Sequence, residues 1–297
     1  MGFNYQLFLQ LTVFGLVEGG LYALVASGLS LTYGVMKILN IAHGEFLMIS
    51  AYVMFWLFTL AGISPLTSLV VTAPLMFMLG LLIFKMIIVP LERVGASHLV
   101  ERSSLIAFFG ILIVFQNAAL VLWSADYRVV TYLQNPIAFL FFNISVNRLV
   151  VLGISIAIIF ALDFFLRRTY SGKAIRAITQ DREAGMLMAI NADRLSFVCF
   201  GLGTLLAGIG GSLAGMLHVI TPGMGFPFLI KAFVVMIIGG LGNMRGCLYA
   251  GFLLGVLEFI GAYFVGEGYR SAIDYVVLVV FLLLVSHGYL GKFGRAL

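Results

Sequence analysis

Residues 8–32 read FLQLTVFGLVEGGLYALVASGLSLT, and Glu18 is the only charged residue in this run. About 20 predominantly apolar residues are enough for an α-helix to cross the hydrocarbon core of a bilayer. The run is therefore long enough to form a first membrane-spanning helix. Similar apolar runs follow along the chain, near residues 41–62, 67–90, 104–123, 147–166, 195–218, 229–243, 247–265 and 273–288.

The overall composition agrees with this pattern. The 297 residues are 62% hydrophobic and 10% charged, with a mean hydropathy of +1.14, whereas soluble domains are about one quarter charged. A membrane β-barrel needs many alternating segments of about ten residues, which this sequence does not show. We therefore predict an all-α polytopic membrane protein with about 8–10 transmembrane helices, organised as a single transmembrane domain over residues 1–297.

Several other classes of protein are disfavoured. Residues 1–15 contain no Lys or Arg, which is more typical of a first span than of a cleaved signal peptide. Cys199 and Cys247 lie in apolar segments without a CxxC motif, so buried free thiols are expected. No basic run with interleaved aromatics suggests a nucleic-acid partner. The HExxH, GxSxG and GxxxxGK[ST] motifs are missing, so we expect neither an enzyme nor an ATP site in this chain.

The distribution of basic residues predicts the orientation. Short cytoplasmic loops are enriched in Lys and Arg, and with the N-terminus outside, 13 of the 17 Lys and Arg residues fall on the inner side. This N-out, C-in arrangement makes 167–194 the longest internal loop and 124–146 the longest external loop. Within the external loop, DYRVVTYL (126–133) alternates and is β-branched, which predicts a short strand or hairpin.

Two stretches interrupt the helical pattern, YGVMKILNIAHGEF (33–46) and ITPGMGFPFLIK (220–231). In the predicted topology they lie on opposite sides of the membrane. Broken or re-entrant segments in corresponding positions of two halves indicate inverted repeats around a central pathway. Glycines cluster in the runs 8–32 and 195–218, and we expect them to form helix-packing faces.

The first break holds Asn40, His43 and Glu45 in or near the membrane, where ionisable groups usually face a cavity or a partner. The spacing of His43 and Glu45 places them on different helix faces, which disfavours a metal site. Two roles remain, the satisfaction of backbone groups at the break and the lining of a transport route. The residues that we predict along such a route are Tyr22, Asn40, His43, Glu45, Thr221 and Lys231.

Three further charged residues lie in or beside apolar runs. Glu18 and Glu258 are in mid-span, where each fits either a proton relay or a hydrogen bond to a neighbouring helix. The chain lacks the series of acids and histidines that relays use, so structural contacts are expected. Lys231 follows the second break and is expected to face outward or into a vestibule, or to snorkel to the interface.

The stretch TQDREAGMLMAINADR (179–194) is unusually polar for this chain. Its composition predicts a short helix with Asp181 as the N-cap and an apolar ridge of two turns that includes Leu187 and Ile190. Such a helix fits two roles equally well. It can rest on the bilayer surface, or it can enter a groove on a cytosolic partner.

Three long stretches resemble the branched-chain amino acid ABC permease family. GKAIRAITQDREAGMLMAINADRL (172–195) is similar to the cytoplasmic loop that carries the coupling helix of that family. GLYALVASGLSLTYGVMKILNIAHGEFLMISAYV (20–53) resembles its N-terminal signature, and PGMGFPFLIKAFVVMIIGGLGNMRG (222–246) its later glycine-rich segment. The likeness extends over roughly residues 12–290, and the order of the motifs is that of the LivH-type subunit.

The resemblance implies a subunit of an importer in the bacterial inner membrane. A periplasmic binding protein would deliver the amino acid, and this chain and a LivM-type sister permease would form the path. Two cytosolic ATPase subunits would hold ATP and Mg, so no cofactor is expected in this chain. The residues implied to contact the ATPase are Arg182, Glu183, Ala184, Gly185, Met186, Leu187, Ile190 and Asn191.

The chain departs from the family pattern at NMRG (243–246) and SHGYLG (286–291), where Ser-Ile-Pro-Gly-like and Pro-Thr-Gly-like turns are usual. These departures leave the substrate open, since members of the family carry urea, short amides and other amino acids. The alternative from a different class is a secondary transporter or channel that acts without an ATPase.

Overall fold

The computed structural model of the chain describes residues 5–94, 97–139 and 142–287. The end of the last predicted span and most of the 286–291 turn lie outside the described residues, as do Lys292 and Arg295, which the orientation argument counts on the inner side.

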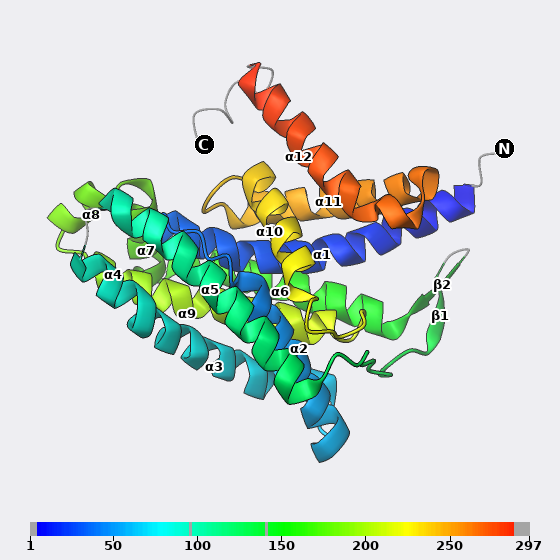
Figure 1. Cartoon of the computed structure of the whole chain (residues 1–297). Helices are drawn as coiled ribbons and strands as arrows, with labels where there is room; N and C mark the ends of the chain where they lie inside the picture. The colour runs from blue at the N-terminus through cyan, green and yellow to red at the C-terminus, as the bar shows by residue number, and fades with distance from the viewer. Residues whose placement is uncertain (1–4, 95–96, 140–141, 288–297) are drawn as a thin grey trace.

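Helices account for nearly all of the described chain (Figure 1). The helices are α1 (Tyr5–Met36), α2 (His43–Ala61), α3 (Pro65–Ile83), a π-helical turn (Phe84–Ile88), α4 (Val89–Val94), α5 (Ser97–Trp123), α6 (Val146–Arg168), α7 (Tyr170–Gln180), α8 (Arg182–Leu187), α9 (Ala192–Ala214), α10 (Gly225–Gly239), α11 (Met244–Val265), a 3-10 turn (Glu267–Tyr269) and α12 (Arg270–Ser286). Within the described ranges, eight helical segments are long and apolar enough to cross a membrane, and α10 is a shorter apolar helix. The all-α membrane fold is confirmed.

The two predicted interruptions are both present. The chain leaves α1 after Met36 and starts α2 at His43, and it leaves α9 after Ala214 and starts α10 at Gly225. Lys37 has a positive φ of 57°, a value that turns the backbone sharply out of α1. At the second interruption, Met224 donates its backbone N–H to the Thr221 carbonyl at 3.1 Å, which closes a turn just before α10.

The same pattern of helix packing occurs twice in the fold, once around α1 and once around α9. The long helix α1 packs on α11 and α10, while the long helix α9 packs on α3 and α2. The short connections are matched as well, because α2 packs on α3 and α10 packs on α11. Figure 1 shows that α1 starts at the end that carries the β-hairpin and α9 at the opposite end, beside α8. This arrangement is that of two inverted repeats, as the two interruptions indicated.

Small residues form the seam between α1 and α11. Gly15 and Gly19 on α1 face Gly255 and Gly251 on α11, so two GxxxG stretches meet. A Cβ added to Gly15 would lie 2.7 Å from the Gly255 carbonyl oxygen, and a Cβ on Gly251 would lie 2.5 Å from that of Gly19. Glycine therefore allows direct backbone contact between these helices, which confirms the predicted packing role of the first-span glycines.

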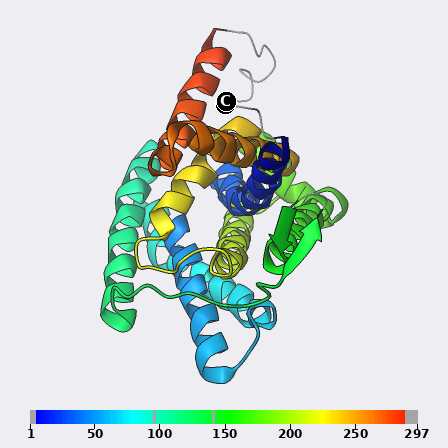
Figure 2. The same ribbon diagram turned by 90° about the vertical axis from the view of Figure 1, so that its right-hand side faces the viewer.

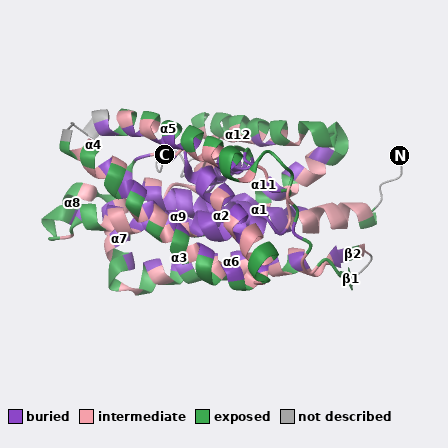
Figure 3. Cartoon of the chain, turned by 60° about the horizontal axis from the view of Figure 1, so that its bottom comes forward, coloured by how far each residue is buried: buried purple, intermediate pink, exposed green. Residues whose placement is uncertain are grey.

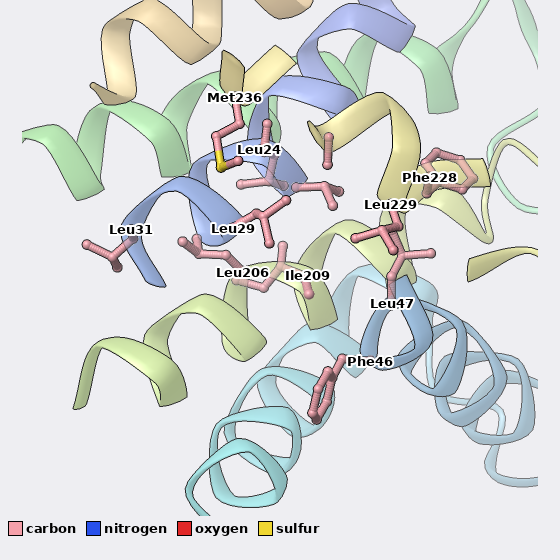
Figure 4. Packing of buried hydrophobic residues seen from close by; sticks show 14 of the residues in the cluster. Leu24, Leu29, Leu31, Phe46, Leu47, Leu206, Ile209, Phe228, Leu229 and Met236 are labelled. Carbon is pink, nitrogen blue, oxygen red and sulfur yellow. The ribbon is translucent and has the colours of Figure 1, made fainter. Parts of the chain in front are cut away.

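The buried core lies along α1, α9, α2 and α10, and the outer helices surround it. Figure 3 shows buried residues concentrated in α1, α2 and α9, with exposed faces on α3, α5, α6 and α12. In the close view of Figure 4, Leu24 and Leu29 of α1 approach Leu206 of α9, and Leu47 of α2 approaches Leu229 of α10. The exposed outer faces are apolar, as contact with lipid requires.

The loop 124–146 does contain a hairpin, but the residues differ from those predicted. The strands are β1 (Pro136–Phe139) and β2 (Phe142–Ser145). The DYRVVTYL segment is not a strand, although Arg128 forms one bridge with Ile220 through N–H···O bonds of 3.1 and 2.8 Å. Its guanidinium also donates to the Trp123 carbonyl and stacks on Trp56. The segment is therefore tied to the α9–α10 connection and crosses this end of the molecule (Figure 2).

Candidate functional site

The starts of α2 and α10 meet inside the protein. Gly44 and Gly225 are in direct backbone contact, and a Cβ added to Gly225 would lie 2.6 Å from the Gly44 carbonyl oxygen. His43 Nε2 lies 3.1 Å from the carbonyl oxygen of Val25, well inside the long helix α1. The two connections leave their long helices at opposite ends of the molecule (Figure 1), since Gly34 near the end of α1 lies beside Thr179 of α7 and Ile220 pairs with Arg128 of the 124–146 loop. Each connection folds back into the interior, so that both half-helices start at one junction.

Asn40, His43 and Glu45 are all buried at this junction. Nε2 of His43 donates to the carbonyl oxygen of Val25, which leaves Nδ1 as an acceptor, and Nδ1 has no hydrogen-bond partner among the residues that the structure describes. Both amide atoms of Asn40 and Oε2 of Glu45 also lack a partner. Leaving a buried polar group unpaired costs about 1–3 kcal/mol. A role in pairing backbone groups therefore accounts for Nε2 of His43, which bonds to the Val25 carbonyl. It does not account for the amide atoms of Asn40, which remain unpaired.

A network of charged side chains lies on the other side of α10. Lys231 forms ion pairs with Glu258 of α11 and, at 3.2 Å, with Asp274 of α12, and it donates to the Tyr22 hydroxyl of α1 at 3.3 Å. Arg270 Nε donates to Glu258 Oε1 at 2.7 Å. The Lys231 side chain is only 11% exposed. The predictions that Lys231 faces outward or snorkels are therefore wrong, because its ammonium group is neutralised inside the bundle.

A second ion pair extends this network toward the hairpin end. Glu18 of α1 lies 2.9 Å from Nε2 of His218, which belongs to the α9–α10 connection. Glu258 thus makes the contact to a neighbouring helix that was expected for it, whereas the partner of Glu18 lies in a connection between helices. Sequence reasoning missed His218, Arg270 and Asp274. The signal was present in part, since Asp274 is the only acidic residue inside the last apolar run.

The predicted route residues thus fall into two neighbouring groups on either side of α10. Tyr22 and Lys231 belong to the charged network, while Asn40, His43 and Glu45 surround the junction. Thr221 stands apart in the α9–α10 connection, where it is partly buried.

The loop 167–194 folds into two helices, α7 and α8, and ends in the first turn of α9, and each of these three helices starts with a side-chain cap. Thr169 accepts from the Gly172 N–H at the start of α7, Asp181 from the Ala184 N–H at the start of α8, and Asn191 from the Arg194 N–H at the start of α9. The predicted N-cap, Asp181, is confirmed. Asn191 lies beyond the end of α8 and starts the next helix instead.

The helix α8 is shorter than predicted. It ends at Leu187, and the left-handed residue Ala189 (φ 59°) turns the chain away, so Ile190 packs inward and the ridge of two turns does not form. The exposed apolar residues are instead Leu187, 88% exposed, and Met188, 79% exposed, with Met186 beside them. The predicted contacts Arg182, Glu183 and Ala184 also reach the surface, whereas Gly185 is buried against Ile178.

The base of this loop is joined to the rest of the bundle. Asp163 of α6 accepts from Arg167 Nε at 2.8 Å and from Arg245 Nε of α11 at 2.9 Å. Thr179 of α7 touches Gly34 at the end of α1, and a Cβ on Gly242 would lie 2.9 Å from its methyl group. The helix α7 therefore lies against the end of α1 and the turn that precedes α11.

The sequence is similar to known proteins over nearly its whole length. The model of the branched-chain amino acid transport system permease component family matches residues 11–286. The high-affinity branched-chain amino acid permease BraD of Pseudomonas aeruginosa is 31% identical over 96% of both chains. LivH of Escherichia coli K12 is 29% identical over 98% of both, and a probable LivH of Methanocaldococcus jannaschii is 27% identical over 93% of this chain and 90% of its own. No solved structure matches the chain. With a family model that covers nearly its whole length and relatives of the same extent, the chain belongs to the family of branched-chain amino acid transport permease components.

Proposed function

We propose that this chain and a LivM-type sister permease together form the inner-membrane path of a binding-protein-dependent ABC importer for branched-chain amino acids. Two separate ATPase subunits hold ATP and Mg, and a periplasmic binding protein delivers the substrate. The names of the relatives support the substrate class, since BraD and LivH are branched-chain amino acid permeases. The same-family alternative, an importer of urea, short amides or other amino acids, differs in the substrate alone.

The observation that carries this proposal is the exposed apolar tip of α8. Leu187 is the last residue of α8 and Met188 follows it, the helices before and after α8 have side-chain caps, and the Arg182–Asp193 pair at 3.4 Å closes the base of this segment. An exposed apolar tip on a short helix is suited to a groove on a partner protein. A helix that rested on the bilayer would be expected to present a longer apolar face.

The contacts of α7 supply a route by which movement of α8 reaches the membrane. Gly172 packs on the backbone of Phe165 and Leu166, so α7 follows the end of α6. Thr179 touches the ends of α1 and of the α10–α11 turn, and Asp163 ties α6 to α11 through Arg245. A push on α8 would therefore reach α1, α6 and α11 together, as rocking of packed helices requires.

The basic residues support the N-out orientation. Arg167, Arg168, Lys173 and Arg176 lie in α6 and α7, next to α8, whereas the hairpin lies at the opposite end (Figure 1). Cytoplasmic loops carry this excess of positive charge. The α8 end thus faces the cytosol and the ATPases, and the hairpin end faces the binding protein.

The junction of α2 and α10 is the proposed position of the path within this subunit. Asn40, His43 and Glu45 offer unpaired polar atoms there, and the two half-helices both start at this point. Irregular backbone at membrane depth is tolerated where it is buried in protein or lines a cavity.

The test replaces Leu187 by Asp in the reconstituted complex of permeases, ATPases and binding protein. The Leu187 side chain is 88% exposed and is not part of the core of this chain, so the permease pair should assemble normally. We expect co-purification of the ATPase and substrate-stimulated ATP hydrolysis to fall by about tenfold or more, as for a central apolar interface residue. Gly185 is a poorer probe, because a Cβ there would meet Ile178 Cδ1 at 2.6 Å and distort α8 itself.

Tyr127→Asp is the matched control, since Tyr127 is 82% exposed at the hairpin end. It should leave co-purification of the ATPase, and basal ATP hydrolysis measured without the binding protein, unchanged. Normal coupling in Leu187→Asp would remove α8 as the docking element. Uptake by the purified permease chain in vesicles without any ATPase would instead establish the secondary-transporter alternative.

A further inference from the structure

A cavity of about 340 Å³ opens at the hairpin end, between the 129–148 segment and the α9–α10 connection. Figure 2 looks onto this face and shows the extended segment that follows α5 crossing it beside that connection. The volume is within the range of about 300–1,000 Å³ that is typical of small-molecule sites. We call this cavity the hairpin-end pocket. Its walls include three apolar side chains, Val129, Met216 and Leu217, and three polar ones, Asn147, Arg148 and His218.

Asn147 is part of the wall of this pocket and carries a buried acceptor that has no partner among the described residues. The residue is only 5% exposed, and its Nδ2 donates to the Met216 carbonyl at 3.2 Å. That bond fixes the orientation of the side chain, while Oδ1 has no hydrogen-bond partner. A buried carbonyl oxygen that is held in place and left free is suited to accept an N–H from a ligand.

Arg148 is a cation at this pocket that makes no direct ion pair within the described residues, and the Glu18 carboxylate acts on it only at longer range. Its guanidinium lies 4.2 Å from the centre of the Phe14 ring, and its buried Nη1 has no hydrogen-bond partner. By contrast, Lys231 and Arg270 share Glu258, and His218 is paired with Glu18. In the part of the chain that the structure describes, the side chain of Arg148 makes neither an ion pair nor a hydrogen bond. A planar guanidinium with free donors is suited to bind a carboxylate in a bidentate manner.

We propose that the hairpin-end pocket binds an aliphatic α-amino acid as a zwitterion. Arg148 binds the carboxylate, Oδ1 of Asn147 accepts from the ammonium group, and the aliphatic side chain lies against Val129, Met216 and Leu217. The choice of an amino acid rests on the proposed function, whereas the carboxylate and aliphatic selectivity follow from the walls themselves. In the proposed orientation this pocket is the first site that a substrate reaches after release from the binding protein.

The pocket is tested by equilibrium binding to the permease pair in lipid nanodiscs, without the binding protein. The probes are radiolabelled L-leucine, with leucinamide and 4-methylpentanoate as competitors. We expect 4-methylpentanoate to compete better than leucinamide, because it keeps the carboxylate. Arg148→Gln should weaken leucine binding by about tenfold or more, the loss expected for a charge-assisted hydrogen bond, and should abolish the preference between the two competitors. Arg148→Lys should restore part of both.

Arg128→Gln is the matched control, because it removes a positive charge at the same end from a residue outside the pocket lining. Absence of leucine binding to the unmodified pair, or equal effects of the Arg148 and Arg128 variants, would overturn the proposal. So would intact leucine binding in Arg148→Gln together with lost affinity for the binding protein, because Arg148 would then contact an acidic residue of that protein. Failure of the proposed function can be distinguished from failure of this pocket assignment. It would appear as a lack of leucine-driven ATP hydrolysis by the unmodified complex.

Discussion

Gly44 and Gly225 bring the starts of α2 and α10 into backbone contact at the centre of the fold. No side chain fits between them, because a Cβ on Gly225 would lie 2.6 Å from the Gly44 carbonyl oxygen and 2.9 Å from Glu45 Oε1. The contact also sets the position of the unpaired polar atoms of Asn40 and Glu45.

Gly225→Ala should therefore destabilise the protein. Overpacking against a fixed backbone typically costs about 1–3 kcal/mol, and we expect the free energy of unfolding in detergent to fall by this amount. Gly153→Ala in α6 is the control, since an added Cβ there meets nothing within 4 Å. The control should be neutral or slightly stabilising, as alanine is the better helix former. Equal stability of the two variants would contradict the close contact.

Glu258→Gln should be among the most damaging charge removals in the chain. Glu258 neutralises both Lys231 and Arg270, and after the change Arg270 retains only the exposed Glu267 at 3.7 Å. Breaking a buried ion pair from one side costs about 3–5 kcal/mol. Denaturant unfolding of the purified protein measures the loss.

The control for this change is Glu267→Gln, whose side chain is 76% exposed. An exposed pair contributes about 0–1 kcal/mol, so this variant should unfold close to the native protein. The double variant Lys231→Met/Glu258→Gln should lose less stability than the sum of the two single changes, because the residues share one network. Strict additivity would show that the two charges act independently.

The orientation is accessible to cysteine labelling. Cys199 and Cys247 are both fully buried, so the native chain should give little background. A membrane-impermeant maleimide added to spheroplasts should label Tyr127→Cys at the hairpin end and should not label Leu187→Cys on α8. Permeabilised membranes should give both signals. The reverse pattern in spheroplasts would place the N-terminus inside.

Hydropathy predicted the fold well because each span is decided locally. A run such as 195–218 needs only its own apolar residues to be recognised as a helix, and α9 lies there. The packing of one span against another is not decided locally. The residues next to Lys231 in the sequence do not predict that Glu258 and Asp274 lie beside it. For this reason the sequence predicted a lysine at the surface, and the structure has a buried one.

The candidate site shows the same limit. The polar break at Asn40, His43 and Glu45 was visible as an anomaly in an apolar chain, but its contact with Gly225 depends on a fold-back of the second connection. In the α8 loop, the cap at Asp181 is a local signal and was predictable. The turn at Ala189, which directs Ile190 inward, depends on a left-handed backbone that alanine rarely adopts.

The glycine seam between α1 and α11 constrains how this subunit can move. Two helices that touch through side chains can slide, because rotamers adjust. Gly15 and Gly255 touch through backbone, and a shift of one position would drive Leu16 or Val256 into the partner helix. The pair should therefore move as one rigid unit, and a gate in this subunit should open where α10 or α12 packs against it.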